Sequence, residues 1–334
     1  MSTWLVIPSC RPASLQLFFD AWGGRGGWDR VVIVEDQPQK SGLWGSWGGQ
    51  PPTHFSHKEI AEVLGEDAWI ISKKDSACRC FGFLWAWWNG ADRVITLDDD
   101  CYPLPGCENF AEMHGDAMIH PQWVPSVPGM DTRGMPYYQR GMVLNVMANV
   151  GLWTENPDLD APQTLVHGNM AGYVPPPGNR IVPAGQFAPL CGMNLCIQRQ
   201  ALPLFFFPLM GDGQPYRRMD DIWSGIIAKH CMDHLGWRLS VGEPFVKHCR
   251  ASDPMANLVK EAPGIAANET FWQTIAEIDL TAADAIGCME EIGQGLLEES
   301  GYLRNLGNAL KVWAKLCRKG LPANQERACT TATA

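Results

Sequence analysis

Residues 94–100 read Val94-Ile95-Thr96-Leu97-Asp98-Asp99-Asp100, and this stretch decides the expected fold. A short, apolar, β-branched run is typical of a buried strand, and here three carboxylates follow it directly. Like charges gathered at one strand end repel one another, so a positive group is expected to neutralise them. A hard divalent cation with open positions for phosphate oxygens would do so. The alternative interpretation is an acidic turn or a helix N-cap.

Similar runs at residues 4–7, 31–34 and 69–72 are expected to form further strands. Helix-like segments at 13–22 and 57–64 separate them. This alternation predicts βαβ units and a parallel sheet, in which ligands bind beyond the carboxyl ends of the strands. The polar side chains that follow the first two strands are Ser9, Arg11, Glu35 and Asp36.

The composition excludes several classes of protein. A chain of 334 residues with 46% hydrophobic content can form one large α/β domain and a smaller appendage. Its formal net charge of -10 argues against general nucleic-acid binding. The N-terminal run lacks the basic flank of a secretory signal, and the apolar stretch at 201–210 is far shorter than the roughly 20 residues that span a bilayer. We therefore expect a cytoplasmic protein without a membrane span.

The 12 cysteines are scattered through apolar segments. In a chain without a secretory signal this pattern favours reduced thiols that pack in the core. The closest pair, Cys78 and Cys80, has no second cluster of ligands, so a structural zinc site is not expected.

The pattern along the chain predicts three parts. Residues 1–270 are expected to form the large α/β domain, within which the Pro- and Gly-rich stretch 121–189 forms loops laid over the sheet. From about residue 271 the apolar spacing becomes helical, which predicts a C-terminal helical region at 271–329. This region could present a solvated face or join two copies in a homo-oligomer. Residues 330–334 are expected to be disordered.

Two further positions are candidates for chemistry. Asp220 and Asp221 precede a helix-like segment, so they serve either as caps and dipole partners or as a base or charge stabiliser. His248 follows the strand-like residues 244–246 and is either structural or a metal ligand.

Several separated segments together resemble one family. They are Ser76-Ala77-Cys78-Arg79, the strand end at 98–100, Gly151-Leu152-Trp153, Asn156-Pro157-Asp158-Leu159-Asp160-Ala161-Pro162, Cys191-Gly192-Met193-Asn194-Leu195, Leu209-Met210-Gly211-Asp212-Gly213-Gln214-Pro215, Asp220-Asp221-Ile222-Trp223-Ser224-Gly225, Asp233-His234-Leu235-Gly236 and a run from His248 to Leu258. Their order and spacing, up to about residue 272, resemble the reversibly glycosylated polypeptides, or UDP-arabinopyranose mutases. The resemblance implies a GT-A type, Rossmann-like mixed α/β sheet that binds a UDP-sugar.

The resemblance also implies roles for particular residues. Asp98, Asp100 and His248 would hold Mn²⁺ or Mg²⁺, with Asp98 also near the ribose. The residues expected to contact the nucleotide sugar are Ser9, Arg11, Asp36, Ser76, Arg79, Asp98, Asp99, Trp153, Asn194 and Lys260, with Arg79 or Lys260 on phosphate. For Asn194 a role in a turn is the alternative.

Arg140 is the best match for the arginine that the family glycosylates reversibly. Because arginine stays protonated near neutral pH, it needs a carboxylate for this chemistry, and Asp220 or Asp221 could supply it. A phosphate or carboxylate clamp is the alternative role for Arg140. The sequence thus predicts a mutase for UDP-arabinopyranose and UDP-arabinofuranose. A glycosyltransferase with an external acceptor, or a self-glycosylated partner protein, are the alternatives.

Overall fold

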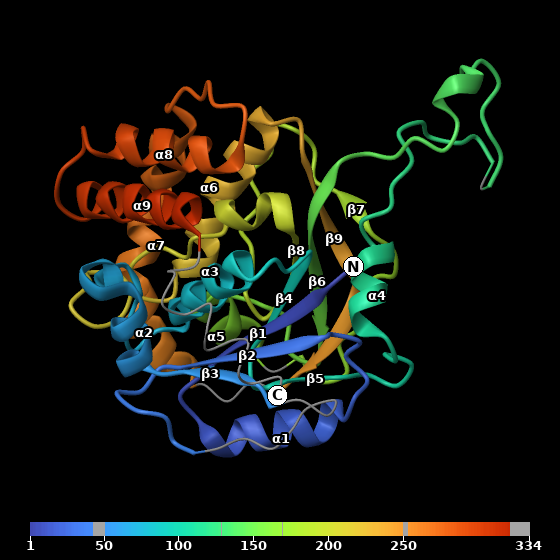
Figure 1. The fold of residues 1–334 in the computed structure, drawn as a ribbon. Coiled ribbons are helices and arrows are strands. Elements are labelled where there is room, and N and C mark those ends of the chain that lie inside the picture. The colour runs from blue at the N-terminus through green and yellow to red at the C-terminus, as the bar shows by residue number, and fades with distance from the viewer. Residues whose placement is uncertain (43–50, 128, 169, 250–252, 321–334) are drawn as a thin grey trace.

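The computed structural model describes residues 1–42, 51–127, 129–168, 170–249 and 253–320, so the expected tail at 330–334 lies outside the described residues. The chain forms one mixed sheet whose strands run in the order β3-β2-β1-β4-β8-β6-β9-β5, with β7 beside β9. Helices lie on both faces of the sheet (Figure 1). This α/β architecture confirms the predicted fold class.

The first half of the sheet is parallel. β1 pairs with β2 and β4, and β2 pairs with β3, all in the same direction. The bounds are β1 (Thr3–Ser9), β2 (Arg30–Glu35), β3 (Thr53–Phe55) and β4 (Arg93–Leu97). Because β1, β2 and β4 are almost entirely buried, their runs of Val, Ile and Leu read as continuous apolar stretches. Their carboxyl ends meet at one edge, where the polar residues follow.

The second half of the sheet is mixed. β8 is antiparallel to both β4 and β6, and β6 is parallel to β9. Two short strands, β5 and β7, pair antiparallel with β9. The bounds are β5 (Cys101–Tyr102), β6 (Val146–Thr154), β7 (Arg180–Ile181), β8 (Asn194–Gln198) and β9 (Arg238–His248). The pairing of β5 with β9 places the residues just after β4 against the end of β9.

The helices are α1 (Pro12–Trp22), α2 (His57–Leu64), α3 (Cys80–Trp88), α4 (Phe110–Asp116), α5 (Ala161–His167), α6 (Asp220–His234), α7 (Pro254–Ala276), α8 (Ala285–Leu296) and α9 (Gly301–Lys319), with short 3-10 turns η1 (Gly65–Ile70), η2 (Ser76–Arg79), η3 (Tyr137–Gln139) and η4 (Arg199–Leu204). In Figure 1, α1 lies below the sheet and α3, α8 and α9 lie above it. The expected helices at 13–22 and 57–64 correspond to α1 and α2.

The expected strand at 69–72 was wrong. Residues Gly65–Ile70 form η1, and Thr53–Phe55 takes the place beside β2 as β3. Ile70 and Ile71 are buried all the same. A four-residue apolar run predicts that the segment is buried, but it does not distinguish a strand from a helical turn.

The expectation of loops over the sheet at 121–189 was also wrong in part. This stretch contains β6, a central strand of nine residues, and α5. Gly151 in β6 lies so close to its neighbours that a Cβ atom would approach the Asn194 Nδ2 atom to 2.1 Å. Where close packing requires glycine in a strand, the run of large apolar residues that would identify the strand in the sequence is interrupted. Residues 119–127 and 129–143, in contrast, form a segment that projects away from the body (Figure 1).

The C-terminal helices pack on the main domain. α8 and α9 pair with each other and contact η4, α6 and α3. The expected boundary at 270/271 falls inside α7, a helix of 23 residues. Trp313 of α9 is buried and donates its indole hydrogen to the Pro203 carbonyl at 2.7 Å. The apolar face of α9 is therefore covered by the chain's own core.

Two further observations concern the whole chain. In the part that the structure describes, no helix is long and apolar enough to cross a membrane. The described cysteines are free thiols, and all but Cys10 and Cys249 are buried, which agrees with the expected packing role.

Candidate functional site: an acidic and basic cavity

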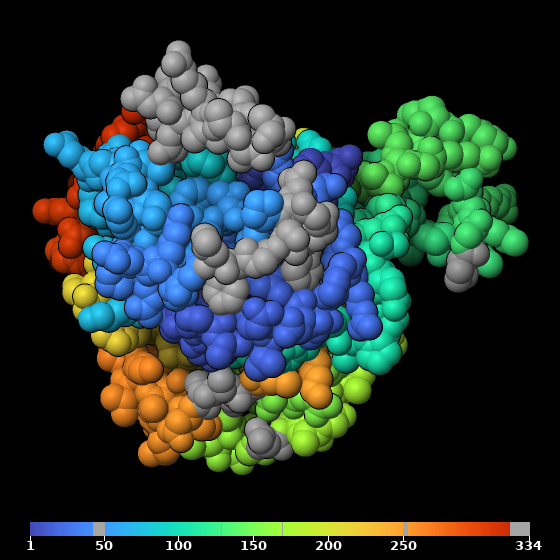
Figure 2. Space-filling model, turned by 60° about the horizontal axis from the view of Figure 1, so that its bottom comes forward, coloured from blue at the N-terminus to red at the C-terminus, as the bar shows by residue number. Residues whose placement is uncertain are grey.

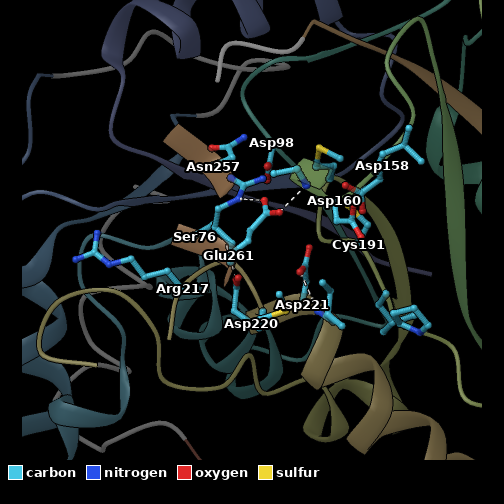
Figure 3. A pocket seen from close by; sticks show the side chains of 18 of the residues that line it. Ser76, Asp98, Asp158, Asp160, Cys191, Arg217, Asp220, Asp221, Asn257 and Glu261 are labelled. Atoms are coloured by element: carbon cyan, nitrogen blue, oxygen red, sulfur yellow. Dashed lines mark hydrogen bonds and ion pairs between the residues drawn. The ribbon is translucent and has the colours of Figure 1, made fainter. Parts of the chain in front are cut away.

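A cavity of about 730 Å³ opens beyond the carboxyl end of β4, between the sheet and the helices α5, α6 and α7. Figure 3 shows its carboxylates arranged around one space, although they come from distant parts of the chain. The charged side chains that line it are Arg11, Lys74, Asp75, Arg79, Asp98, Asp100, Asp158, Asp160, Arg217, Arg218, Asp220, Asp221, His248, Lys260 and Glu261. Such a mixture suits a ligand that carries phosphates and a metal ion.

The three aspartates after β4 have three different surroundings. Asp98 pairs with Arg79 at 2.5 Å, and Asp99 accepts hydrogen bonds from Ser9 and Arg11. Asp100 has only a long contact of 3.4 Å with Arg11. Two arginines of the chain itself therefore supply part of the neutralising charge that the sequence predicted. Asp100 is the least compensated of the three.

Arg79 is the buried centre of this arrangement, with 2% of its side chain exposed. Besides Asp98, its guanidinium donates to the Thr96 hydroxyl at 3.0 Å and to the Gly192 carbonyl at 2.5 Å. A Cβ atom on residue 192 would lie 2.7 Å from the Arg79 Nη1 atom, so only glycine leaves room here. Five donors in a planar fork allow one arginine to hold several acceptors in fixed positions. Arg79 therefore fixes Asp98 at the cavity wall.

Asp100 and His248 lie together and fit a divalent cation. β5 pairs with β9 so that Cys101 is opposite His248, and the Cys249 amide donates to the Asp100 carbonyl at 3.0 Å. The Asp100 Oδ1 atom is buried without a hydrogen-bond partner. The His248 Nδ1 atom lies 2.9 Å from the Asn156 carbonyl, so Nδ1 carries the hydrogen and Nε2 is left as an acceptor. This second bond is typical of a metal-ligating histidine.

The protein does not complete such a site alone. Among the residues that the structure describes, no three histidine, cysteine, aspartate or glutamate side chains converge to hold a metal ion. A cation at Asp100 would need oxygen atoms from a ligand or from water to fill its coordination shell.

Four further carboxyl groups that line the cavity have pKa values above the ordinary aspartate value. Burial, and then the charge of Asp36, raises the pKa of Asp75 to about 6. Burial and then Asp158 raise the pKa of Asp221 to about 6, and burial raises the pKa of Asp158. Burial and then Asp75 raise the pKa of Asp220 well above the ordinary aspartate value. Raised carboxyl pKa values in a cavity are typical of sites that transfer protons.

Helix α6 and its neighbours position these groups. Asp220 and Asp221 stand in the first turn of α6, as expected, and neither caps the helix with its side chain. Asp220 accepts from the Ser76 hydroxyl at 3.0 Å, and Asp221 accepts from the Gly192 amide at 3.0 Å. Both carboxylates therefore bind groups across the cavity as well as contributing to the helix.

Several predicted residues do line the cavity. Besides the groups described above, these are Arg11, Ser76, Trp153 and Lys260. Trp153 is 6% exposed, and its indole Nε1 atom is a buried donor without a partner. A ligand hydroxyl or phosphate oxygen at that point would satisfy it.

Other predicted residues lie behind the wall. Ser9 and Asp99 are buried and bond to each other. Asp36 accepts hydrogen bonds from the amides of Lys74 and Asp75 and from His57, so it positions the loop that reaches the cavity.

Asn194 also lies outside the cavity lining. Its side chain is fully buried and bonds to His114 at 3.0 Å and to the Pro244 carbonyl at 2.9 Å. The expected contact with the sugar is therefore replaced by a role in joining β8 to β9.

Arg140 is not among the cavity residues of its own chain. It lies on the projecting segment, pairs with Asp131 at 2.9 Å and stacks on the Tyr137 ring at 4.1 Å. Nearly half of its side chain is exposed.

Sequence reasoning did not select several cavity residues. Asp158 belongs to a quoted motif, and Glu261 joins α7 to α5 by accepting from the Ala161 amide at 2.7 Å, while its other oxygen pairs with Arg218 at 2.7 Å. The missed polar residues are Lys74, Asp75, Asp158, Asp160, Cys191, Arg217, Arg218, Asn257, Glu261 and Asn268. The quoted motifs contain Asp158, Asp160, Cys191 and Asn257 and were usable signals, whereas Glu261 and Asn268 of α7 lie outside every quoted motif.

The order of the strands, together with an Asp-x-Asp sequence at the end of β4 that opens into a cavity, defines a GT-A type nucleotide-sugar-binding domain. The sequence profile of the reversibly glycosylated polypeptides matches residues 3–114 and 118–320. This chain therefore belongs to the reversibly glycosylated polypeptide family.

Individual relatives agree with this membership. The chain is 33% identical to the probable UDP-arabinopyranose mutase 1 of Pisum sativum, over 93% of this chain and 89% of the relative. It is 36% identical to the UDP-arabinopyranose mutase 3 of Arabidopsis thaliana, over 80% of this chain and 75% of the relative.

Solved structures show more distant similarity. The glucosyl-3-phosphoglycerate synthase of Mycobacterium tuberculosis, in complex with Mn²⁺, UDP and phosphoglyceric acid, has a TM-score of 0.45 and 14% identity, over 84% of this chain and 80% of that one. The mannosyl-3-phosphoglycerate synthase of Rubrobacter xylanophilus has a TM-score of 0.39 and 12% identity, over 84% of this chain and 77% of that one.

Proposed function

We propose that this protein interconverts UDP-arabinopyranose and UDP-arabinofuranose in the cavity beyond β4. The names of its relatives support the reaction, and the charges of the cavity support a nucleotide diphosphate with a divalent cation. The observation that carries the proposal is the Asp100 carboxylate. One of its oxygen atoms is buried without a partner beside His248, at the end of the strand where such domains bind ligands.

The nucleotide would bind through the basic groups of the wall. Arg11, Arg79 and Ser76 lie around the carboxyl ends of β1 and β4, where we place the uridine and ribose. Lys260 of α7 lies on the cavity rim and would approach the diphosphate, because an ammonium group on a flexible stem suits a phosphate. Trp153 would donate its free indole hydrogen to a ligand oxygen.

Asp100 and His248, with Asp98 beside them, would hold Mn²⁺ or Mg²⁺ together with oxygen atoms of the diphosphate. Bound there, the cation neutralises the diphosphate and so improves UDP as a leaving group. Manganese tolerates mixed oxygen and imidazole ligands better than magnesium does, so His248 favours Mn²⁺.

Arg140 would hold the sugar covalently after it leaves UDP as the pyranose and before it returns to UDP as the furanose. A nitrogen of Arg140 attacks the anomeric carbon, the bond from that carbon to the phosphate oxygen breaks, and UDP leaves with the bonding electrons. The proton lost by the guanidinium passes to the carboxylate of Asp220 or Asp221. Asp221, whose pKa is raised to about 6 by burial, is ionised at neutral pH and can accept it. Ring contraction and the reverse attack by UDP complete the cycle.

Purified protein incubated with Mn²⁺ and UDP-arabinopyranose tests this proposal. Chromatography of the nucleotide sugars should show that UDP-arabinopyranose is converted to UDP-arabinofuranose without net release of UDP. Starting from UDP-arabinofuranose, the reverse conversion should be seen. No interconversion with an intact fold would reject the mutase.

A glycosyltransferase with an external acceptor is the second candidate, and the position of Arg140 favours it. In its own chain this residue lies outside the cavity lining. UDP released in step with sugar transferred to an added acceptor would identify this activity.

Mass spectrometry of the Arg140 peptide separates the candidates. Reversible glycosylation adds one sugar mass to this peptide, and excess UDP removes it. Arg140→Lys should abolish the label because an ammonium group lacks the planar guanidinium, whereas Arg133→Lys on the same segment should keep it. Full turnover without the label would favour the external acceptor. Labelling without isomerisation would favour a self-glycosylated partner protein.

The expected compartment is the cytoplasm. The free state of the described cysteines supports this placement, because thiols persist in a reducing compartment. Disulfide mapping of the native protein tests this placement, and stable disulfide bonds would contradict it.

A further inference from the structure

Strand β9 is irregular just before it reaches the cavity. Along β6 its register passes from Gly242 opposite Gly151 to Val246 opposite Trp153. Residues 243–245 therefore lie opposite a single residue of β6, and we call them the β9 bulge. A bulge interrupts the ladder of backbone hydrogen bonds and re-aims the residues that follow it, and bulges are common beside active sites. The residues that follow this one lead directly to His248.

Buried side chains of the two neighbouring strands hold the carbonyl groups of the bulge. The side-chain amide of Asn149 in β6 donates to the Glu243 carbonyl at 2.8 Å, and that of Asn194 in β8 donates to the Pro244 carbonyl at 2.9 Å. Asn194 also reaches the carbonyl of Leu152, the residue opposite the bulge, at 3.5 Å. Both asparagines are fully buried. They supply the hydrogen bonds that buried carbonyl groups need where the ladder is interrupted.

His114 of α4 joins the two asparagines. Its Nε2 atom lies 3.0 Å from the Asn194 Oδ1 atom, and its Nδ1 atom lies 2.9 Å from the Asn149 Nδ2 atom. Because an amide nitrogen only donates, Nδ1 accepts and the ring hydrogen lies on Nε2. Burial lowers the pKa of His114 to about 3, so the ring is neutral near pH 7. The Ser240 hydroxyl completes the network by donating to the Asn149 Oδ1 atom at 2.6 Å.

The network also lies at the base of the projecting segment. The segment that stands away from the body in Figures 1 and 2 begins after α4 and ends before β6. His114 and Asn149 stand on these two elements, 35 residues apart in the sequence, so their hydrogen bond ties the two ends of the segment together. The Phe110 ring packs edge-on against the imidazole, with the centroids 4.9 Å apart. A satisfied buried network of this kind rigidifies the elements that it joins, here α4, β6, β8 and β9.

Two groups at the cavity depend on the register that follows the bulge. Trp153 lies opposite Val246, and His248 lies opposite Cys101 of β5. If the bulge joined the ladder with one residue opposite one, Pro244 would take the place opposite Trp153. His248 would then be displaced by two residues, roughly 7 Å at the usual rise of a strand. Metal–ligand distances tolerate only about 0.2 Å, so the bulge decides whether this imidazole can serve as a ligand.

We propose that His114 is a positioning residue. Through Asn149 and Asn194 it fixes the β9 bulge, and it thereby sets the register in which His248 and Trp153 reach the cavity. His114 is not among the residues that line the cavity, so it acts only through this network. The consequence for metal binding rests on the proposed function, in which His248 is a ligand. The attachment of β9 to the network does not depend on it.

Hydrogen exchange of the metal-free protein tests the attachment of β9. His114→Leu fills much of the same space but leaves a donor of Asn149 and an acceptor of Asn194 buried without partners, at a cost of about 1–3 kcal/mol. The amides of residues 238–249 should therefore exchange about 10-fold faster than in the wild type, whereas those of β1 and β2 should keep their rates. Circular dichroism checks the fold.

Calorimetric titration with Mn²⁺ in the presence of UDP tests the consequence for the cavity. His114→Leu should weaken Mn²⁺ binding about 10-fold, the lower cost of losing a residue that supports a ligand. The affinity for UDP in a chelator should keep its wild-type value, because the network lies away from the ends of β1 and β2. A general structural defect would lower both affinities alike.

A conservative variant and a matched control complete the design. His114→Gln can donate through its amide nitrogen to Asn194 and accept through its oxygen from Asn149, so it should restore slow exchange and Mn²⁺ affinity. His230→Leu on α6 also removes an imidazole, which is hydrogen-bonded to the Ile278 carbonyl at 2.9 Å. This control should leave the exchange of residues 238–249 and the Mn²⁺ affinity unchanged.

Wild-type exchange of residues 238–249 in His114→Leu would overturn the proposal. So would a His114→Gln variant as defective as His114→Leu, because the hydrogen bonds would then not be the cause. If His114→Leu does not fold, Ser240→Ala decides, since it removes only the hydroxyl that donates to Asn149. Wild-type exchange of residues 238–249 in that variant would overturn the proposal.

The two measurements separate this proposal from the proposed function. Faster exchange with unchanged Mn²⁺ affinity in His114→Leu would overturn the positioning of His248. A wild type that binds no Mn²⁺ in the presence of UDP would reject the proposed metal site and, with it, the role of His114 in metal binding. The exchange measurement would still decide whether His114 fixes the β9 bulge.

Discussion

Three neighbouring aspartates at the end of β4 have three different sets of partners because the chain turns directly after the strand, where the Cys101 amide donates to the Asp98 carbonyl at 3.1 Å. Asp98 faces the buried Arg79, and Asp99 is held by Ser9 and Arg11. Only Asp100 keeps a buried oxygen atom without a partner. The motif therefore combines a structural anchor, Asp98, with the proposed metal-binding carboxylate, Asp100, and both line the cavity wall.

Substitution of Asp100 should remove metal binding. Asp100→Asn keeps the shape but loses the charge that a divalent cation requires, so affinity for Mn²⁺ should fall by more than about 100-fold, the upper cost for residues that only support a ligand. Calorimetric titration with Mn²⁺ in the presence of UDP measures the loss. Asp212→Asn is the control, because this aspartate is exposed on the surface. Equal Mn²⁺ affinity in the two variants would exclude Asp100 as a ligand.

Substitution of Asp75 should change stability in a pH-dependent way. The pKa of Asp75 is raised to about 6 in the folded chain, above the ordinary aspartate value, so the folded state favours the protonated form. Its stabilising effect is fully present below about pH 4 and is lost as the pH rises through about 6. Asp75→Asn removes this loss and should stabilise the protein by on the order of 2 kcal/mol at pH 8, but little at pH 4.

Urea unfolding at the two pH values, with a chelator present, measures the difference. The Asn side chain can still accept the hydrogen bond that the Ala77 amide donates to residue 75. A gain of the same size at both pH values would contradict the linkage.

At the scale of elements, the C-terminal helices belong to the same core as the sheet. α7 crosses the expected boundary, and α9 reaches α3 and η4. The indole of Trp313 packs against the Phe206 ring, with the centroids 5.3 Å apart and the planes tilted by 46°. These contacts use the apolar face of α9, so the homo-oligomer expected through the C-terminal helices would have to use their exposed faces.

Truncation of Trp313 should destabilise the whole domain. Trp313→Ala removes a buried indole and its hydrogen bond to the Pro203 carbonyl, which should cost about 3–5 kcal/mol. Because α9 and the sheet share one core, thermal unfolding should stay a single transition at lower temperature. Trp272→Ala, at an indole that is 41% exposed, is the milder control. A separate early transition for the C-terminal helices would show instead that they fold as an independent unit.

At the scale of the whole molecule, the cavity joins groups that only the complete fold brings together. Like-charged carboxylates from η2, β4 and α6 meet there, with arginines between them. Like charges gathered in this way cost stability, and the cation and diphosphate of the proposed function would offset that cost by placing opposite charges between them.

Ligand binding should therefore stabilise the protein measurably. UDP with Mn²⁺, at about 100 times the dissociation constant, should add about 2.7 kcal/mol and raise the Tm by roughly 5 °C. Differential scanning fluorimetry measures the shift, and a chelator should reverse it. UDP that raises the Tm equally in the chelator would argue that the nucleotide binds without the cation.

The sequence by itself determined the parallel strands β1, β2 and β4, the start of α6, and the clustered charge at 98–100. These features follow from local chemistry. A buried strand must be apolar throughout, and the polar residue that ends it is its neighbour in the sequence. Separated motifs in order also determined the family, because agreement at many positions is far more specific than any single spacing.

Only the tertiary structure decided which of those polar residues share a cavity. Asn194 and Asp36 support the site from behind, whereas Asp158 and Glu261 line it, and Arg140 lies on the projecting segment outside the cavity. The physical reason is that burial, pairing and raised pKa values depend on neighbours that lie 100 or more residues away along the chain, as Glu261 and Ala161 do. A sequence pattern shows one residue of each such contact but does not show which distant residue is its partner.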